Sequence, residues 1–81
     1  MTQNRLLIAN RGEIALRIIR SAKEMGLHTI AVYSDVDADS LHVKRADESY
    51  YLGGSLPAES YRNIKNLMKA VVETNADLVH P

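Results

Sequence analysis

The chain has 81 residues, enough for one domain or part of one, and its ten basic and ten acidic residues give a formal net charge of zero. This balance removes the electrostatic case for binding nucleic acid or an anionic membrane, and the absence of cysteine excludes a disulfide framework within the chain. No apolar signal segment is present, and no apolar run approaches the roughly 18 residues of a membrane span. We therefore expect a cytoplasmic protein, although a mitochondrial location also fits.

The first third of the chain predicts two strands joined by a helix. Arg5–Ala9 is a short apolar run, which is typical of a strand covered on both faces. From Glu13 to Met25 the apolar residues recur at helical spacing, and Gly26 is placed to end that helix in a left-handed conformation. Thr29–Tyr33 predicts a second buried strand.

An acidic segment follows the second strand. Asp35, Asp37 and Asp39 alternate as they do in a calcium-binding loop. The glycine and the glutamate that such a loop needs at its sixth and twelfth positions are replaced by Ser40 and Ala46. We interpret the segment as a solvent-exposed loop with Asx turns, and we expect no metal site in the chain.

The remaining residues predict two further helices and two further strands. Leu41–Ala46 suits a short helix in which His42 has a surface or hydrogen-bonded position, and Glu48–Leu52 suits a third strand. Ser60 can cap a longer helix, before Asp77–His80 begins a fourth strand. Chain-breaking residues precede and follow the longer helix, at Gly53, Gly54, Pro57 and Asn75. Its expected buried face consists of Tyr61, Ile64, Leu67, Met68, Val71 and Val72.

The predicted order is β-α-β-(α)-β-α-β, which indicates an α/β fold with a parallel, right-handed, Rossmann-like sheet. Ligands of such sheets bind at the carboxyl ends of the strands, where the corner from Asn10 to Glu13 lies. In this corner we expect Asn10 to cap the first helix and Glu13 to bond back to it. Gly12 would keep a side chain out of a close approach. The last strand has no covering helix, so we expect an architecture that is incomplete at its C-terminus.

The corner allows more than one interpretation on spacing alone. A dinucleotide fingerprint would place its three small positions at Asn10, Gly12 and Ala15, with Asp35 as the ribose-binding acid, but one of the first two glycines is missing. A corner that only caps a helix and turns the chain fits the spacing better. A nucleotide-binding module and a plain interaction domain therefore stay as alternatives.

Longer strings in the sequence resemble a known family. ANRGEIALRIIR, Ala9 to Arg20, resembles the start of biotin carboxylases. The block from Gly26 to Ile64 is similar to the next part of that family, and ADLVHP, Ala76 to Pro81, is similar to the start of its HPGYGFLSEN segment. The resemblance covers nearly the whole chain. It implies that residues 1–81 are a partial N-terminal domain of the pre-ATP-grasp type, followed in the family by ATP-grasp and C-terminal domains.

The resemblance also implies a reaction. Biotin carboxylases, which are ATP-dependent carbon–nitrogen ligases of acyl-CoA carboxylases, activate bicarbonate with ATP and transfer CO2 to biotin on a carrier domain. ATP, magnesium or manganese, and biotin are held in the family by parts outside this chain. The chain is therefore expected to hold no catalytic, cofactor-binding or metal-binding residue and to be inactive alone. Its expected partners are the remaining carboxylase domains, the biotin carboxyl carrier and a second copy in a homodimer.

Two groups of residues are candidates for contacts in the whole enzyme. Arg17, Arg20 and Glu24 share one face of the first helix. In the free-standing bacterial enzyme of the family that the sequence resembles, this face takes part in homodimer contacts, and Arg20 and Glu24 match the positions involved. The second group faces the predicted cleft at the carboxyl edge of the sheet. It consists of Asn10, Arg11, Gly12, Glu13 and His80.

Overall fold

The computed structural model describes residues 4–54, 56 and 60–81. Within them, four parallel strands form one sheet in the order β3-β2-β1-β4. The strands are β1 (Arg5–Ile8), β2 (His28–Ser34), β3 (Glu48–Gly53) and β4 (Leu78–His80). The α/β class and the parallel pairing of the first two strands are confirmed. The predicted strand boundaries differ from the observed ones by at most one residue.

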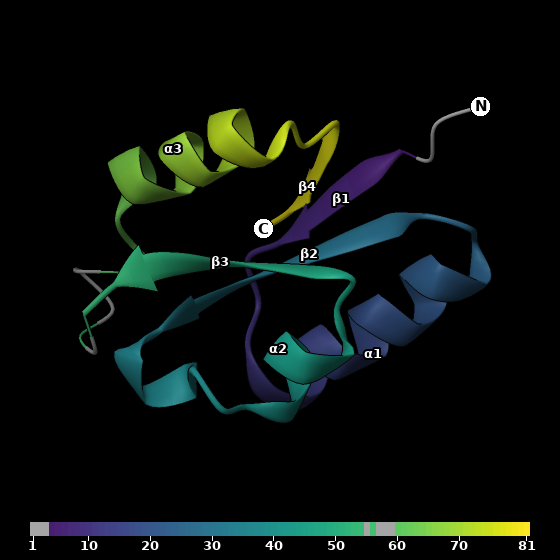
Figure 1. Ribbon diagram of the computed structural model, residues 1–81, viewed down its shortest axis with the longest axis horizontal. Helices are drawn as coiled ribbons and strands as arrows, with labels where there is room; N and C mark the ends of the chain where they lie inside the picture. The colour runs from purple at the N-terminus through teal and green to yellow at the C-terminus, as the bar shows by residue number, and fades with distance from the viewer. Residues whose placement is uncertain (1–3, 55, 57–59) are drawn as a thin grey trace.

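The helices lie on both faces of this sheet. They are α1 (Gly12–Glu24), α2 (Leu41–Arg45) and α3 (Ile64–Thr74), with a 3-10 helix η1 (Asp35–Asp37) after β2. Figure 1 shows α1 and α2 on one face and α3 on the other. Right-handed crossovers require this arrangement, because the chain moves in one direction from β1 to β3 and then returns across the sheet to β4.

The strand β1 contributes to both layers of the core. Leu7 and Ile8 are fully buried, and neighbouring residues of a strand point to opposite faces. Leu7 packs with the cluster under α3, and Ile8 packs with Ala15 and Ile19 of α1. The cluster under α3 consists of Leu7, Ile30, Val32, Leu52 and Ala70. The short apolar run of β1 is therefore the element that both helix layers share.

Both long helices end at the predicted residues. Gly26 has a φ of +79°, and the amides of Gly26 and Leu27 donate to the carbonyls of Lys23 and Ala22, which is a Schellman motif. Asn75 is also left-handed, with a φ of 55°. These stops are local backbone features, which explains why the sequence predicts them.

The start of α3 is not the predicted one. Asn63 is its N-cap, and its side chain accepts a hydrogen bond from the amide of Asn66 at 3.1 Å. Ser60 is buried, and its hydroxyl donates to the carbonyl of Leu56 at 3.2 Å, because residues 60–62 form a turn ahead of the helix. Gly53 ends β3 and Gly54 follows it in a bend, whereas Pro57 lies outside the described residues.

The buried face of α3 also differs from the expected one. Ile64, Met68 and Val72 are 75%, 57% and 70% exposed. The other three predicted residues, Tyr61, Leu67 and Val71, do pack against the core. Within the helix, Leu67 and Val71 form one stripe with Ala70 and Thr74, which are buried and were not predicted. Apolar residues occur on more than one side of α3, so the periodicity alone does not select the side that packs.

Candidate functional site

The corner between β1 and α1 lies at the carboxyl edge of the sheet. Arg11, not Asn10, is the N-cap of α1, and no side chain makes a capping hydrogen bond there. The expected cap at Asn10 and the return bond from Glu13 are therefore wrong. Glu13 is exposed in the first turn of the helix. The amides of this turn are left to solvent or to a partner that covers the corner.

The side chain of Asn10 bonds across the sheet edge instead of capping the helix. His80 Nδ1 donates to Asn10 Oδ1 at 2.8 Å, and the amide of Ala9 donates to the carbonyl of His80 at 2.9 Å. β1 and β4 are the neighbouring strands at which the chain order reverses, which is the usual ligand crevice of an open α/β sheet. Residues 70 positions apart in the sequence thus meet at this crevice.

Gly12 has a conformational role at the corner. Its φ is +62°, and a Cβ built on it would meet no atom within 4 Å. The expectation that glycine clears space for a close approach is therefore not met in the structure. A left-handed first residue lets β1 turn into α1, and this conformation is the reason that glycine suits the position.

A buried carboxylate ties this corner to two other connections. Asp37, in η1, is 5% exposed. Its Oδ1 lies 2.6 Å from Arg11 Nη2, and its Oδ2 accepts a hydrogen bond from the hydroxyl of Tyr61 at 2.7 Å. The hydroxyls of Ser34 and Ser40 donate to the same carboxylate at 3.5 and 3.4 Å. Asp37 therefore occupies a buried position, and the prediction of a solvent-exposed loop is wrong here.

These contacts fix the charge states of the cluster. Burial raises the pKa of Asp37, but hydrogen bonds from Arg11 and Tyr61 outweigh it and hold that pKa below the usual value of 3.8. The pKa of Tyr61 is raised by burial and by its bond to Asp37, so its hydroxyl remains a donor. The Arg11 guanidinium lies over the Tyr61 ring, 5.7 Å from its centroid, and adds a cation–π contact.

His42 lies next to this cluster and is itself buried. It is 1% exposed, and neither ring nitrogen makes a hydrogen bond of normal geometry within the described residues. Burial lowers the pKa of His42, and the backbone of Val32 and the charge of Asp37 oppose this effect only in part. The predicted surface or hydrogen-bonded position of His42 is wrong. The short helix α2 packs against the sheet, and the side of α2 that carries His42 is buried there.

A second polar cluster lies at the other end of the strands. Arg5 donates to the carbonyl of Thr74 at 2.9 Å and pairs with Glu48 at 2.5 Å, and His28 Nε2 lies 3.0 Å from the same carboxylate. The carboxylate of Asp47 accepts hydrogen bonds from the amide and hydroxyl of Thr29, both at 2.8 Å. This cluster joins the starting segments of β1, β2 and β3 to the end of α3, so its role is structural.

The remaining predicted residues form an exposed ridge on α1. Arg17, Arg20 and Glu24 face solvent, and within the described residues none of them has an ion-pair partner. Arg17 of the ridge and His80 of the cleft corner line one apolar groove, whereas Arg20 lines a second hollow between α1 and α2, so the structure does not gather the two groups of candidate residues into a single site. No group of three or more His, Asp or Glu residues suited to a metal ion occurs in the described parts of the chain.

The comparisons with known proteins agree with one another. The family model described as the N-terminal domain of biotin carboxylase matches residues 2–81. The chain belongs to this family. It is 50% identical over 80 residues to the human propionyl-CoA carboxylase alpha chain, mitochondrial, and 52% identical over 81 residues to the biotin carboxylase of a Nostoc strain. It spans 11% and 18% of these two proteins, and 99% and 100% of its own length is covered.

Solved structures give the same assignment. The urea carboxylase of Kluyveromyces lactis superposes with a TM-score of 0.91 at 46% identity, covering 94% of this chain and 7% of that one. A single-chain, multi-domain long-chain acyl-CoA carboxylase superposes with a TM-score of 0.91 at 51% identity, covering 99% and 8%. In the described part of the biotin carboxylase N-terminal domain, no helix is long and apolar enough to cross a membrane.

The Asp37 cluster predicts that Asp37 and Asp39, which lie in one segment, contribute very differently to the free energy of unfolding. Asp37→Ala leaves Tyr61 and Arg11 without their acceptor and should lower the free energy of unfolding by about 2–3 kcal/mol. Asp39 is exposed, so Asp39→Ala should change it by less than about 0.5 kcal/mol. Urea unfolding of both variants measures the difference, and equal effects would contradict the role assigned to Asp37.

His42 predicts a loss of stability at mildly acidic pH. Its pKa is lowered in the folded state, so the unfolded chain binds the proton first as the pH falls below 6.5. The stabilisation is complete above that value and is lost toward the folded pKa, at up to about 1.4 kcal/mol per pH unit. Urea unfolding between pH 7.5 and 5.5 should show this slope, and His42→Phe should flatten it. An unchanged slope in the variant would exclude His42 as its source.

Proposed function

We propose that this chain serves as the N-terminal part of the biotin carboxylase unit of an acyl-CoA carboxylase. The observation that supports it is the family match over residues 2–81, together with the two superpositions at a TM-score of 0.91. The whole protein would use ATP and bicarbonate to carboxylate biotin on a carrier domain. The absence of cysteine fits a reducing compartment such as the cytoplasm.

The chain's own part in this reaction is to form a scaffold and one wall of the cleft. The cleft-facing group is Asn10, Arg11, Gly12, Glu13 and His80. Two ties hold this wall: Asn10 bonds His80 on the neighbouring strand, and Arg11 pairs with the buried Asp37. These two contacts would hold the residues of the corner in place while other domains bind and release substrates.

The corner does not fit a nucleotide phosphate or a metal ion. Glu13 places a carboxylate in the first turn of α1, where a phosphate would otherwise bind the amides. The side chain of Asn10 is bonded to His80, and Arg11 is paired with Asp37. We therefore assign ATP, magnesium or manganese, and biotin to the remaining domains. The same observations disfavour the alternative of an independent nucleotide-binding module.

An apolar groove beside β4 supports a larger assembly. It has a volume of about 470 Å³, and Ile14 and Met25 in its lining are 60% and 75% exposed. The groove is lined by Leu6, Ile14, Arg17, Ile18, Ser21, Ala22, Met25, Leu27 and His80. Exposed apolar surface of this kind marks an interaction site, which fits an intimate contact with other carboxylase domains.

The activity assay separates the chain from the whole protein. The whole protein should release ADP from ATP in a manner that depends on both bicarbonate and free biotin. The 81-residue chain should show none of this activity, because the groups that would bind ATP are proposed to lie in other domains. A whole protein that forms no bicarbonate-dependent ADP would refute the proposed function.

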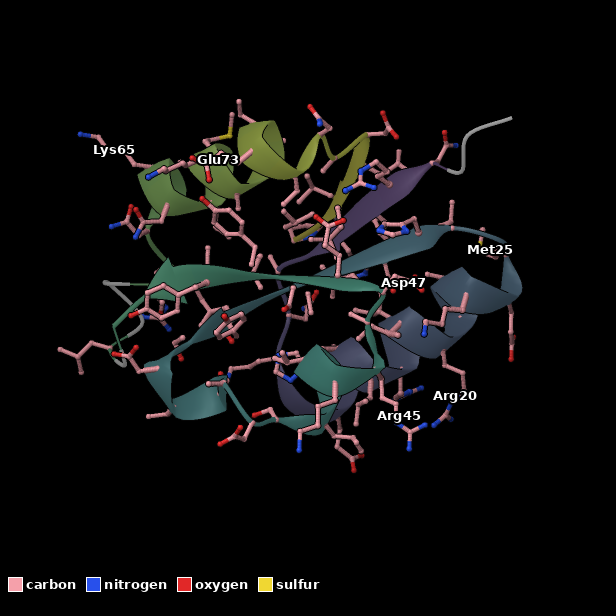
Figure 2. The ribbon with its side chains drawn as sticks, viewed as in Figure 1. Arg20, Met25, Arg45, Asp47, Lys65 and Glu73 are labelled. Carbon is pink, nitrogen blue, oxygen red and sulfur yellow. The ribbon has the colours of Figure 1, made fainter. Side chains whose placement is uncertain are left out.

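The α1 ridge is proposed as a contact with a second copy in the whole enzyme. Arg17, Arg20 and Glu24 are exposed charges without ion-pair partners in the described residues, so they are free to pair across an interface. Arg17→Glu should shift the whole enzyme toward the monomer in sedimentation velocity. The matched variant Lys65→Glu reverses an exposed charge on the opposite face of the sheet and should leave the distribution unchanged (Figure 2).

A further inference from the structure

The buried histidine of α2 is connected to the cleft corner through the start of its own helix. Ser40, two residues before His42, is the N-cap of α2. Its hydroxyl donates to Asp37 Oδ1 at 3.4 Å, and its amide donates to the carbonyl of Asp37 at 2.9 Å. The same Oδ1 atom pairs with Arg11 at 2.6 Å. A short series of contacts thus joins the segment that carries the buried ring to the guanidinium at the corner.

The surroundings of the His42 ring suit its neutral form only. The ring is 1% exposed, and neither nitrogen makes a hydrogen bond of normal geometry within the described residues. A proton on the ring would create a charge and a second N–H donor, and a buried charge needs a partner at close range. An apolar side chain of similar size would fill the space without two unpaired nitrogens, so the presence of a histidine here calls for an explanation.

The charges that act on His42 come from two other connections. Asp37 of η1 favours a proton on the ring, and Arg11 of the corner opposes it. The elements packed on α2 are α1 and β2, and from β2 the carbonyl of Val32 faces the ring. The other charged residues on α2, beside it in the chain or on the adjoining side of α1 are Arg20, Lys23, Asp35, Asp39, Lys44 and Arg45. None of them contributes to the shift in the pKa of His42.

The proton and the ion pair therefore oppose each other. Arg11 neutralises Asp37, and this reduces the attraction that Asp37 would exert on a proton at His42. Such a coupling is reciprocal, so a proton at His42 weakens the pair as much as the pair disfavours the proton. The hydroxyl of Tyr61 stays on the carboxylate as a neutral donor and does not change the balance of charge.

We propose that His42 makes the cleft corner sensitive to protons: a proton on its ring weakens the ion pair between Arg11 and Asp37 and loosens Arg11 at the cleft wall. The consequence for catalysis rests on the proposed function, because Arg11 belongs to the wall of the proposed cleft. Burial disfavours the charged ring, so the effect begins below the ordinary histidine pKa of 6.5 and is absent at alkaline pH.

Hydrogen–deuterium exchange at the carbon between the two ring nitrogens, followed by mass spectrometry of the whole carboxylase, measures the protonation midpoint of His42. Arg11→Gln should raise this midpoint by at least about half a pH unit, because Asp37 then lacks its cation. The matched control Lys44→Gln removes an exposed charge of the same sign from α2 itself. It should leave the midpoint within about 0.2 pH units of the parent value.

Arginine modification of the unsubstituted carboxylase tests the reciprocal effect and does not depend on the folding of the Arg11 variant. The rate of modification of Arg11 by phenylglyoxal is divided by that of Arg45, which is exposed and has no ion-pair partner in the described part of the chain. The pH dependence of the reagent cancels in this ratio. From pH 8 to one unit below the His42 midpoint, the ratio should rise at least about threefold, and in His42→Phe it should stay constant.

Each other outcome overturns the proposal. A midpoint that Arg11→Gln does not move, or that Lys44→Gln moves equally, would show that His42 is not coupled to the ion pair. A constant ratio of modification rates in the parent, or a ring that stays neutral down to about pH 5, would show that the corner does not respond to protons. Bicarbonate-dependent ADP release is measured on the same preparations. An active enzyme without the coupling refutes the proton-sensitive corner alone, whereas an inactive parent enzyme refutes the proposed function.

Discussion

The buried carboxylate of Asp37 is the interaction on which the carboxyl end of the sheet depends. It receives Arg11 from the connection after β1 and Tyr61 from the connection before α3, while it lies itself in the connection after β2. A charge removed from water must be compensated by partners at close range. The carboxylate of Asp37 is compensated only when the three connections hold Arg11 and Tyr61 next to it. This requirement fixes the position of the cleft wall, because Arg11 belongs to it.

Much of the fold could be predicted from the sequence, because the features concerned are local. The apolar run of β1, the helical spacing of α1 and the left-handed stops at Gly26 and Asn75 each involve a few consecutive residues. The handedness of crossovers then leaves little freedom in the topology. Sequence similarity predicted more than these local rules, because it identified the family, and the family model matches residues 2–81.

The candidate site was less predictable, because its contacts join distant segments. Arg11 and Tyr61 are 26 and 24 positions from Asp37, and no spacing rule connects them. Asn10 has the composition of a helix cap, but its neighbour across the sheet is His80, so the tertiary contact displaces the local one. The burial of His42 likewise depends on how α2 packs on the sheet, which the polar sequence of that helix does not reveal.

The outer side of β4 is one of two edges at which the described sheet is able to grow, the other being β3. β4 pairs with β1 alone among the described strands, and Leu78 and Val79 are 45% and 47% exposed. An edge of this kind is a template for one more strand. A parallel strand added there would place its own carboxyl end beside His80. The Asn10–His80 contact would then lie in the interior of a longer row of strand ends, flanked by loops on both sides.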